Sequence, residues 1–221
     1  MRVLLFGATG MVGQGVLREC LLDPDVTRVL AVGRSSAGQR DPKVSEIIAP
    51  NLFDLSGFAP QLSDFHACFF TLGVSSAGMS ETDYTRITFD LTLSVANMLV
   101  TLNREMTFIY VSGAGTGGRS MWARVKGRTE KEILRLPFKA AYIFRPGIIQ
   151  PMHGIRSRTR SYRIFYTALK PMLTILRRLF PGYVTTTEQV GRAMLTVAKN
   201  GFRKPILESR DIAECVKRSS F

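Results

Sequence analysis

The chain has 221 residues, of which 45% are hydrophobic and 21% charged, and its formal net charge is +13. This composition fits one globular domain with a sizeable core and excludes a disordered protein. The chain has no apolar run of about 18 residues, no signal peptide after Arg2 and only three widely spaced cysteines, so we expect a cytoplasmic protein with reduced thiols and no transmembrane helix.

The first stretch of the chain predicts a dinucleotide-binding unit. Residues 3–6 form a short apolar run typical of a buried strand, and a helix-compatible run extends over 12–22. Between them lie Gly7, Gly10 and Gly13. Gly7 would allow the tight turn, Gly10 the approach of a pyrophosphate, and Gly13 close packing of helix on sheet. The helix N-terminus would then direct free N–H groups at the phosphates. The alternative is a plain glycine-rich turn between strand and helix.

The second strand, predicted over 26–32, carries a cofactor signal at its end. NAD enzymes usually place an acidic residue there for the ribose 2′-hydroxyl. This chain has Gly33, Arg34, Ser35 and Ser36 instead. A guanidinium can form bidentate, charge-assisted bonds with a phosphate. Arg34 with the two serines therefore favours NADP over NAD.

Further strands alternate with helices along the chain. Strands are predicted over 44–49, 67–72, 107–111 and 140–144, and helices over 82–102 and 122–136. In the longer helix the apolar residues recur at spacings of three and four and predict a core-facing stripe made of Ile87, Leu91, Val95, Met98 and Leu102. This alternation predicts an α/β fold built on a doubly wound parallel sheet.

The pattern changes after Ile148. We expect one domain over 1–221, with a cofactor-binding core over 1–150 and a small region of substrate-side helices over 151–221. Within the latter, a helix N-cap signal at 185–188 precedes an amphipathic helix over 190–198, and a short strand is predicted over 206–208. His66 and His153 lack the spacing of metal ligands, so no metal site is expected.

A basic stretch lies in the second half of the chain. Between Ile133 and Thr187 there are ten Lys or Arg residues and no Asp or Glu. Such a stretch is either a solvated face or a surface for an anionic partner. Residues 156–180 are basic and apolar, which suits peripheral contact with an anionic membrane. The preferred interpretation is that residues 162–180 pack over the crevice as a lid. Nucleic acid is not expected because no recognition motif accompanies the charge.

Several motifs together resemble one family. They are the glycine motif at 7–13, Arg34, the Thr-Leu-Gly at 71–73, the Val-Ser at 111–112, Lys126 and Gly127 with Glu130, and the Phe-Arg-Pro-Gly at 144–147. The chain resembles the atypical short-chain dehydrogenase/reductases, NAD(P)-binding relatives of nucleoside-sugar epimerases. Within them it looks most like the Tat-interacting-protein-like oxidoreductase branch. The resemblance implies an NAD(P)-binding Rossmann fold.

The resemblance also implies where a cofactor would bind. In such proteins the first loop holds the pyrophosphate, a basic residue after strand two the 2′-phosphate, a pair after strand three the adenine, and later strand ends the ribose and nicotinamide. The corresponding positions here are Gly7, Thr9, Gly10, Met11, Val12, Arg34, Asn51, Leu52, Leu72, Gly73, Lys126, Pro146, Gly147 and Ile148.

Catalysis in this family uses Ser or Thr, Tyr and Lys, and the lysine lowers the pKa of the tyrosine one helical turn before it. Here Trp122 stands four residues before Lys126, and the indole N–H cannot cycle a proton at neutral pH. Lys126, Ser112 and Thr116 are therefore the candidate catalytic residues. Tyr84 and solvent are further sources of a proton.

Three functions follow from these observations. The first is an NADP(H)-dependent oxidoreductase or epimerase-like enzyme acting on a small molecule. The second is a non-catalytic NADP(H)-sensing protein, which the missing tyrosine favours. The third is association with a membrane surface through residues 156–180. No motif identifies the substrate or the oligomeric state.

Overall fold

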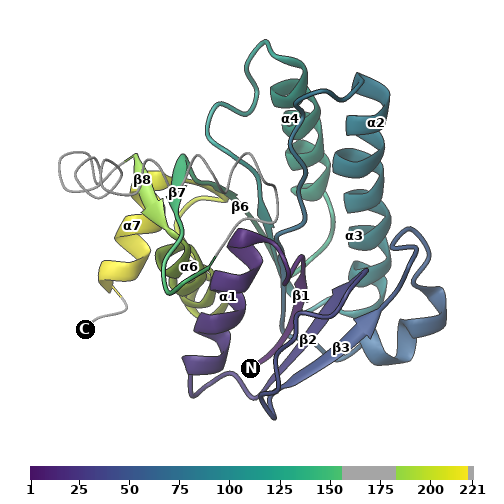
Figure 1. The fold of residues 1–221 in the computed structure, drawn as a ribbon, viewed down its shortest axis with the longest axis vertical. Helices are drawn as coiled ribbons and strands as arrows, with labels where there is room; N and C mark the ends of the chain where they lie inside the picture. Colours follow the sequence, from purple (N-terminus) through teal and green to yellow (C-terminus); the bar gives the residue numbers. More distant parts are fainter. Residues whose placement is uncertain (156–182, 219–221) are drawn as a thin grey trace.

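The computed structural model describes residues 1–155 and 183–218. Its centre is a seven-stranded sheet in the order β3-β2-β1-β4-β5-β6-β9, in which every neighbouring pair is parallel (Figure 1). The strands are β1 (Arg2–Phe6), β2 (Arg28–Gly33), β3 (Val44–Ile48), β4 (Ala67–Phe70), β5 (Thr107–Val111), β6 (Ala140–Arg145) and β9 (Ile206–Glu208). The predicted doubly wound parallel α/β sheet is thereby confirmed.

Helices cover both faces of the sheet (Figure 1). One face carries α1 (Met11–Leu22), α6 (Thr187–Asn200) and α7 (Ser209–Arg218). The other carries the 3-10 helix η1 (Ser56–Leu62), α2 (Glu81–Thr85), the π-helical segment η2 (Arg86–Asp90), α3 (Leu91–Leu102) and α4 (Met121–Ile133).

The central strands are apolar throughout because both of their faces are buried. Successive β1 side chains point to opposite faces, so Val3 and Leu5 join the core under α1 and α6. Leu4 and Phe6 join the core under α3. On that second face Phe70 stacks against Phe6, with ring centroids 5.4 Å apart. The two cores hold the strand ends, and therefore the loops that follow them, in fixed positions.

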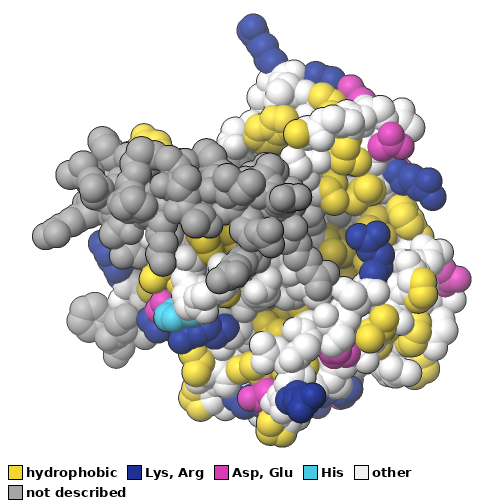
Figure 2. All heavy atoms as spheres, viewed as in Figure 1, with side chains coloured by type: hydrophobic (Ala, Val, Ile, Leu, Met, Phe, Trp, Pro, Cys, Tyr) yellow, Lys and Arg dark blue, Asp and Glu magenta, His cyan; other side chains and the backbone are white. Residues whose placement is uncertain are grey.

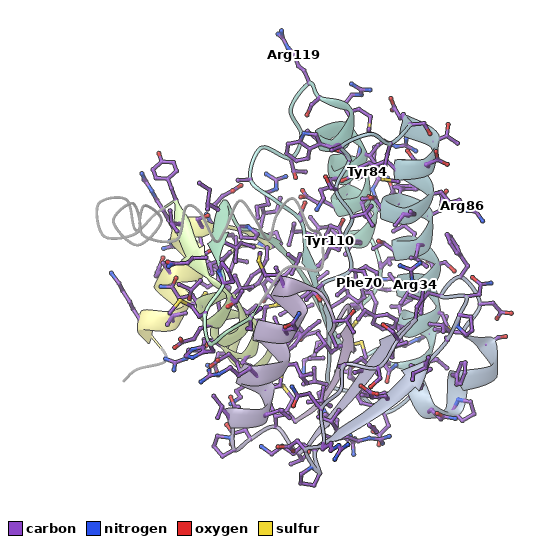
Figure 3. The ribbon with its side chains drawn as sticks, viewed as in Figure 1. Arg34, Phe70, Tyr84, Arg86, Tyr110 and Arg119 are labelled. Carbon is purple, nitrogen blue, oxygen red and sulfur yellow. The ribbon has the colours of Figure 1, made fainter. Side chains whose placement is uncertain are left out.

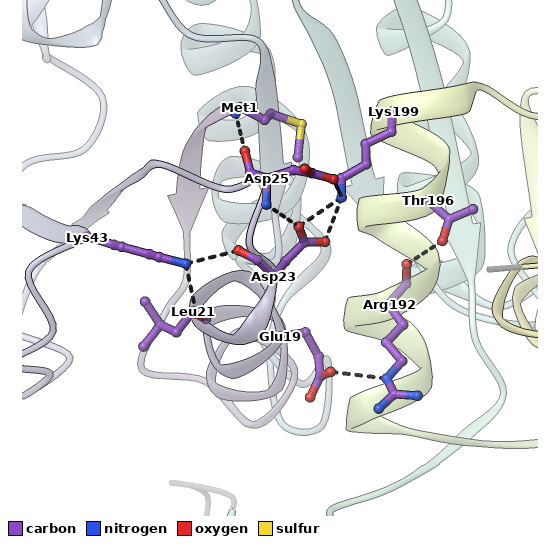
Figure 4. Close-up of polar contacts among 9 residues, drawn as sticks. All are labelled: Met1, Glu19, Leu21, Asp23, Asp25, Lys43, Arg192, Thr196 and Lys199. Atoms are coloured by element: carbon purple, nitrogen blue, oxygen red, sulfur yellow. Dashed lines mark hydrogen bonds and ion pairs between the residues drawn. The ribbon is translucent and has the colours of Figure 1, made fainter. Parts of the chain in front are cut away.

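Two glycines bring α1 and α6 into close contact. A Cβ at Gly15 would lie 2.6 Å from Cβ of Thr187, and one at Gly191 would lie 2.8 Å from Cγ of Glu19. The buried Glu19 carboxylate accepts a hydrogen bond from Nε of Arg192 at 3.2 Å. Figure 4 shows this pair across the two helices. The helix that starts at the glycine loop is therefore fixed to α6.

Ion pairs also join the far ends of α1 and α6 (Figure 4). Lys199 Nζ lies 2.8 Å from a carboxylate oxygen of Asp23 and 2.6 Å from one of Asp25. Lys43 donates to the carbonyl oxygens of Leu21 and Asp23 at 3.0 and 2.9 Å, which satisfies acceptors left open at the end of α1.

The helical run over 81–102 contains a π-helical segment that the sequence pattern did not predict. The extra residue of a π turn changes the phase of the helix. Leu91 and Val95 are buried as predicted, but Ile87 is 38% exposed. The predicted inclusion of Ile87 in the core-facing stripe is therefore wrong.

The region after Gln150 contributes to the main sheet and to a small second one. Strand β7 (Ile148–Gln150) pairs in parallel with β8 (Val184–Thr186), and β9 extends the main sheet beside β6. Thr186 caps α6, and its side chain and that of Gln189 form a capping box. The division at residue 150 stays a prediction. In the part of the chain that the structure describes, no helix has the length and hydropathy to cross a bilayer.

Candidate functional site

The glycine loop between β1 and α1 is packed so closely that side chains at Gly7 and Gly13 would not fit. A Cβ at Gly13 would lie 2.0 Å from the carbonyl oxygen of Gly7, so α1 packs directly on the loop. Gly7 has a φ of +87°, and its carbonyl accepts the N–H of Gly10 at 2.9 Å. Gly10 is the N-cap of α1 and offers no side-chain acceptor, and the first turn, with Met11 and Val12, contains no acid. The first N–H groups of α1 are therefore open to an anion.

A cavity lies at the carboxyl ends of β1, β2, β3 and β4. Its lining includes Gly7, Thr9, Arg34, Leu52 and Leu72, five of the predicted cofactor residues. Arg34 is exposed at the end of β2 (Figure 3). From β1 the chain continues to β2 and β3 on one side of the sheet, and from β4 it continues to β5 and β6 on the other side. Open α/β sheets bind ligands at such a switch point.

Two other predicted cofactor residues lie beside the cavity without lining it. Asn51 is exposed, and its Oδ1 accepts the backbone N–H of Phe53 at 3.0 Å. Gly73 follows Leu72, and a Cβ there would meet no atom within 4 Å. The space over Gly73 is therefore open.

Glu46 lines the same cavity, and sequence reasoning missed it. It lies on β3 opposite Ala31 of β2, and its Oε1 accepts the backbone N–H of Ala37 at 2.7 Å. We predicted no acid at the end of β2, and the cavity receives one from the neighbouring strand. A charged residue inside a predicted strand was the available signal, but only the register of β2 and β3 places Glu46 at the cavity.

Ser112 and Thr116 come together at the end of β5. Their hydroxyl oxygens lie 3.1 Å apart, and Thr116 also donates to the carbonyl oxygen of Gly113 at 2.7 Å. Both residues are buried. Because Thr116 donates its proton to Gly113, it can accept a hydrogen bond from the Ser112 hydroxyl.

Lys126 extends over the ring of Tyr110, with Nζ 5.7 Å from the ring centroid. Tyr110 lies on β5, and Ser112 directly follows the last residue of that strand. Burial lowers the pKa of the Lys126 ammonium from its usual range to about 8, against the opposing effect of Glu130. Within 1–155 and 183–218, no carboxylate forms an ion pair with Lys126.

Trp122 packs on the loop that follows β5. A Cβ at Gly115 would lie 3.4 Å from Cη2 of the indole. Tyr84, named above as a source of a proton, is 2% exposed, and burial raises the pKa of its phenol. In Figure 3 Tyr84 and Tyr110 lie within the body of the molecule. Both rings belong to the core, and neither residue lines the cavity at the strand ends.

The Pro146–Ile148 segment follows β6 and is fixed by its neighbours. The Pro146 carbonyl accepts the N–H of Ala114 at 3.0 Å, and the N–H of Gly147 donates to Oγ of Ser209 at 2.8 Å. Ile148 is 40% exposed. The segment therefore lies beside the loop after β5, which also carries Ser112.

A buried ion pair stands behind this part of the site. The Glu130 carboxylate accepts from Nε of Arg145 at 3.0 and 3.1 Å, and Arg145 also contacts Glu208 at 3.2 Å. These hydrogen bonds to carboxylates raise the pKa of the Arg145 guanidinium. The contacts join α4, which carries Lys126, to β9 and to β6, which leads directly into the Pro146–Ile148 segment.

The predicted sites on the basic stretch fall outside the described residues. They comprise the segment 156–180, which was predicted as a membrane contact or a lid. On the face shown in Figure 2, the Lys and Arg side chains of the described part are dispersed among polar and apolar ones.

Comparison with models of known protein families gave no match. Curated relatives are named after FMP52. The chain is 29% identical over 207 residues to protein fmp52, mitochondrial, of Emericella nidulans, with 86% of this chain and 84% of that protein covered. It is 27% identical over 228 residues to FMP52, mitochondrial, of Saccharomyces cerevisiae, with coverage of 97% and 96%.

Solved structures show the fold. A UDP-N-acetylglucosamine 4-epimerase of Methanobrevibacter ruminantium matches with a TM-score of 0.69 at 14% identity, covering 91% of this chain and 74% of that one. A short-chain dehydrogenase/reductase of Burkholderia thailandensis matches at 0.67 and 16%, covering 96% and 92%. MoeE5, in complex with UDP-glucose and NAD, matches at 0.66 and 15%, covering 100% and 82%.

The chain thus has the Rossmann fold of NAD(P)-binding short-chain dehydrogenase/reductases and epimerases, as the resemblance implied. The predicted cytoplasmic location is contradicted, because the curated relatives are named mitochondrial proteins. Free, widely spaced cysteines fit any reducing compartment and do not single out the cytoplasm.

Proposed function

We propose that this protein binds NADP(H) and is an oxidoreductase of the short-chain dehydrogenase/epimerase type. One observation carries the proposal: α1 packs against the Gly7 carbonyl through Gly13, with an N-terminus that no side chain caps. This is the cradle that a pyrophosphate requires. The residues at the cavity fit the rest of a dinucleotide, with Arg34 at the end of β2 and Leu72 at the end of β4.

The proposed cofactor contacts follow the order of the strands. Thr9, Gly10, Met11 and Val12 would hold the pyrophosphate, Arg34 the 2′-phosphate, and Asn51 and Leu52 the adenine. The sheet edge then continues past Leu72 and Gly73 to Ser112, Lys126 and Pro146–Ile148, which would face the nicotinamide half. The motifs named above are the support for the finer assignment to the Tat-interacting-protein-like branch, and the names of the relatives support a mitochondrial location.

Arg34→Ala is expected to weaken NADPH binding about ten- to hundredfold and to change NADH binding less than about twofold, because a charge-assisted bond to a phosphate is worth about 1.5–3 kcal/mol. Titration of NADPH and NADH fluorescence measures both affinities. Arg40→Ala is the matched control, since Arg40 is an exposed arginine of the same loop outside the cavity lining. Equal losses for NADPH and NADH would contradict the assignment of NADP.

The reaction assigned to the site is reduction of a carbonyl or its reversal. When bound, a nicotinamide dinucleotide supplies or takes up the hydride at the substrate carbon. The Ser112 hydroxyl can turn its proton from Thr116 to the substrate oxygen, while Thr116 keeps its bond to the Gly113 carbonyl. The Lys126 ammonium delivers a proton to that oxygen, a role that its lowered pKa suits. Because residue 122 is a tryptophan and carries no phenol, it does not compete with Lys126 for the role of proton donor.

Lys126→Met is expected to lower kcat about 10²- to 10⁴-fold, the usual contribution of a general acid. In the native protein, carbonyl reduction should decline as the pH rises through about 8, where the ammonium loses its proton. A stopped-flow pH profile of NADPH oxidation tests this. Lys126→Arg is the control, because a guanidinium keeps the charge but does not release a proton.

A second function, NADP(H) sensing without catalysis, is favoured by one observation. The Trp122 ring packs on the Gly115 loop, which gives position 122 a structural task. Under this function the native protein would bind NADPH yet turn over no carbonyl, quinone or nucleotide sugar, and Lys126→Arg would behave as the native protein at every pH.

A further inference from the structure

The loop after β2 is held by a side chain from the neighbouring strand. Glu46 and Arg34 line one cavity, and Oε1 of Glu46 accepts the N–H of Ala37 at 2.7 Å. A hydrogen bond from a backbone N–H to a carboxylate is stronger than one between neutral groups. A second bond, from the N–H of Gly38 to Oγ of Ser36 at 2.9 Å, tightens the same turn.

The Arg34 guanidinium is left available by this arrangement. Among the described residues, no carboxylate lies within ion-pair distance of Arg34, although Glu46 lines the same cavity. The Glu46 oxygen is directed instead to a backbone group three residues after Arg34 in the loop. The carboxylate therefore fixes the loop without neutralising its cation.

We propose that Glu46 is the positioning residue for selection of the cofactor's 2′-phosphate: by binding the Ala37 N–H, it holds residues 34–37 in the conformation in which Arg34 faces the cavity. This inference rests on the proposed binding of NADP(H) and adds the residue that would determine its specificity. Glu46 acts through Arg34 and makes no contact with the phosphate. A carboxylate that bound the ribose 2′-hydroxyl itself would favour NAD instead.

Two small nucleotides isolate the 2′-phosphate. Adenosine 2′,5′-bisphosphate and 5′-AMP differ in that group alone, so the ratio of their dissociation constants reports its recognition. Calorimetric titration is done on the native protein, Glu46→Ala, Glu46→Gln, Arg34→Ala and the double variant. Glu46→Gln keeps an oxygen that can accept the Ala37 N–H.

Glu46→Ala is expected to lower the preference for the bisphosphate about tenfold, the worth of one hydrogen bond to a charged group, with 5′-AMP affinity unchanged. Glu46→Gln should keep most of the preference. In the Arg34→Ala background, Glu46→Ala should change the ratio less than about twofold, because the two residues act as one unit. Thermal unfolding of each variant shows that the fold is retained.

Other results would overturn the inference in separable ways. Weaker binding of 5′-AMP in both Glu46 variants would make Glu46 a ribose ligand. Additive effects of Arg34→Ala and Glu46→Ala would show that Glu46 does not act through Arg34. A native protein that binds 5′-AMP and the bisphosphate equally would refute the proposed NADP preference, and one that binds neither would refute the proposed function as well.

Discussion

Gly13→Ala is expected to abolish dinucleotide binding. The new Cβ would lie 2.0 Å from the Gly7 carbonyl oxygen and 2.6 Å from its carbon, so α1 or the loop must move. Either movement displaces the N–H groups that would hold the pyrophosphate. Loss of one charge-assisted bond costs about tenfold in affinity, and several bonds are lost together. The overpacking should also lower the free energy of unfolding by about 1–3 kcal/mol.

The measurement combines NADPH titration with urea unfolding. Gly57→Ala is the matched control, because Gly57 has no atom within 4 Å of a new Cβ and lies in η1, away from the cavity. It should leave both NADPH affinity and stability close to native values. Native affinity in a folded Gly13→Ala protein would show that the ligand does not use this loop.

Glu130→Gln is expected to be the most destabilising of the changes considered. The Glu130 side chain is 3% exposed and pairs with Arg145, which is itself 20% exposed. Removing one partner of a buried pair leaves an uncompensated charge and costs about 3–5 kcal/mol. Since Arg145 keeps its contact with Glu208, the loss should lie near the lower value, about 3 kcal/mol.

A neighbouring ion pair on the same helical turn provides the control. Glu132 pairs with Arg135 at the surface, where both side chains are well exposed. Such pairs contribute about 0–1 kcal/mol, so Glu132→Gln should shift the urea midpoint little. Equal shifts for the two variants would mean that the Glu130–Arg145 pair does not hold α4 to β6.

The sheet and the glycine loop could be predicted because local pattern determines them. Val3–Phe6 and 107–111 are short apolar runs bounded by turn residues, and a strand buried on both faces needs nothing else. Gly13 was assigned close packing on the basis of spacing, and the 2.0 Å approach to Gly7 is the physical reason.

Features that depend on tertiary contacts could not be predicted in this way. The π segment at 86–90 shifts the helix phase, so Ile87 reaches solvent although its spacing matches the stripe. Glu46 enters the cavity only through the register of β2 and β3. The helix α7 was missed because its amphipathic pattern is short, and Ile212 and Cys215 on its apolar face pack against the core.

The contact between α1 and α6 has a consequence for attempts to shorten the chain. Gly15 and Gly191 bring the two backbones so close that each helix buries one side of the other, and α6 shields Glu19 from water. A fragment ending at Gln150 would uncover that carboxylate and the apolar flank of α1. We therefore expect the first 150 residues to be recovered as insoluble material when expressed alone. A fusion protein that folds should need both the segment with α1 and the segment with α6.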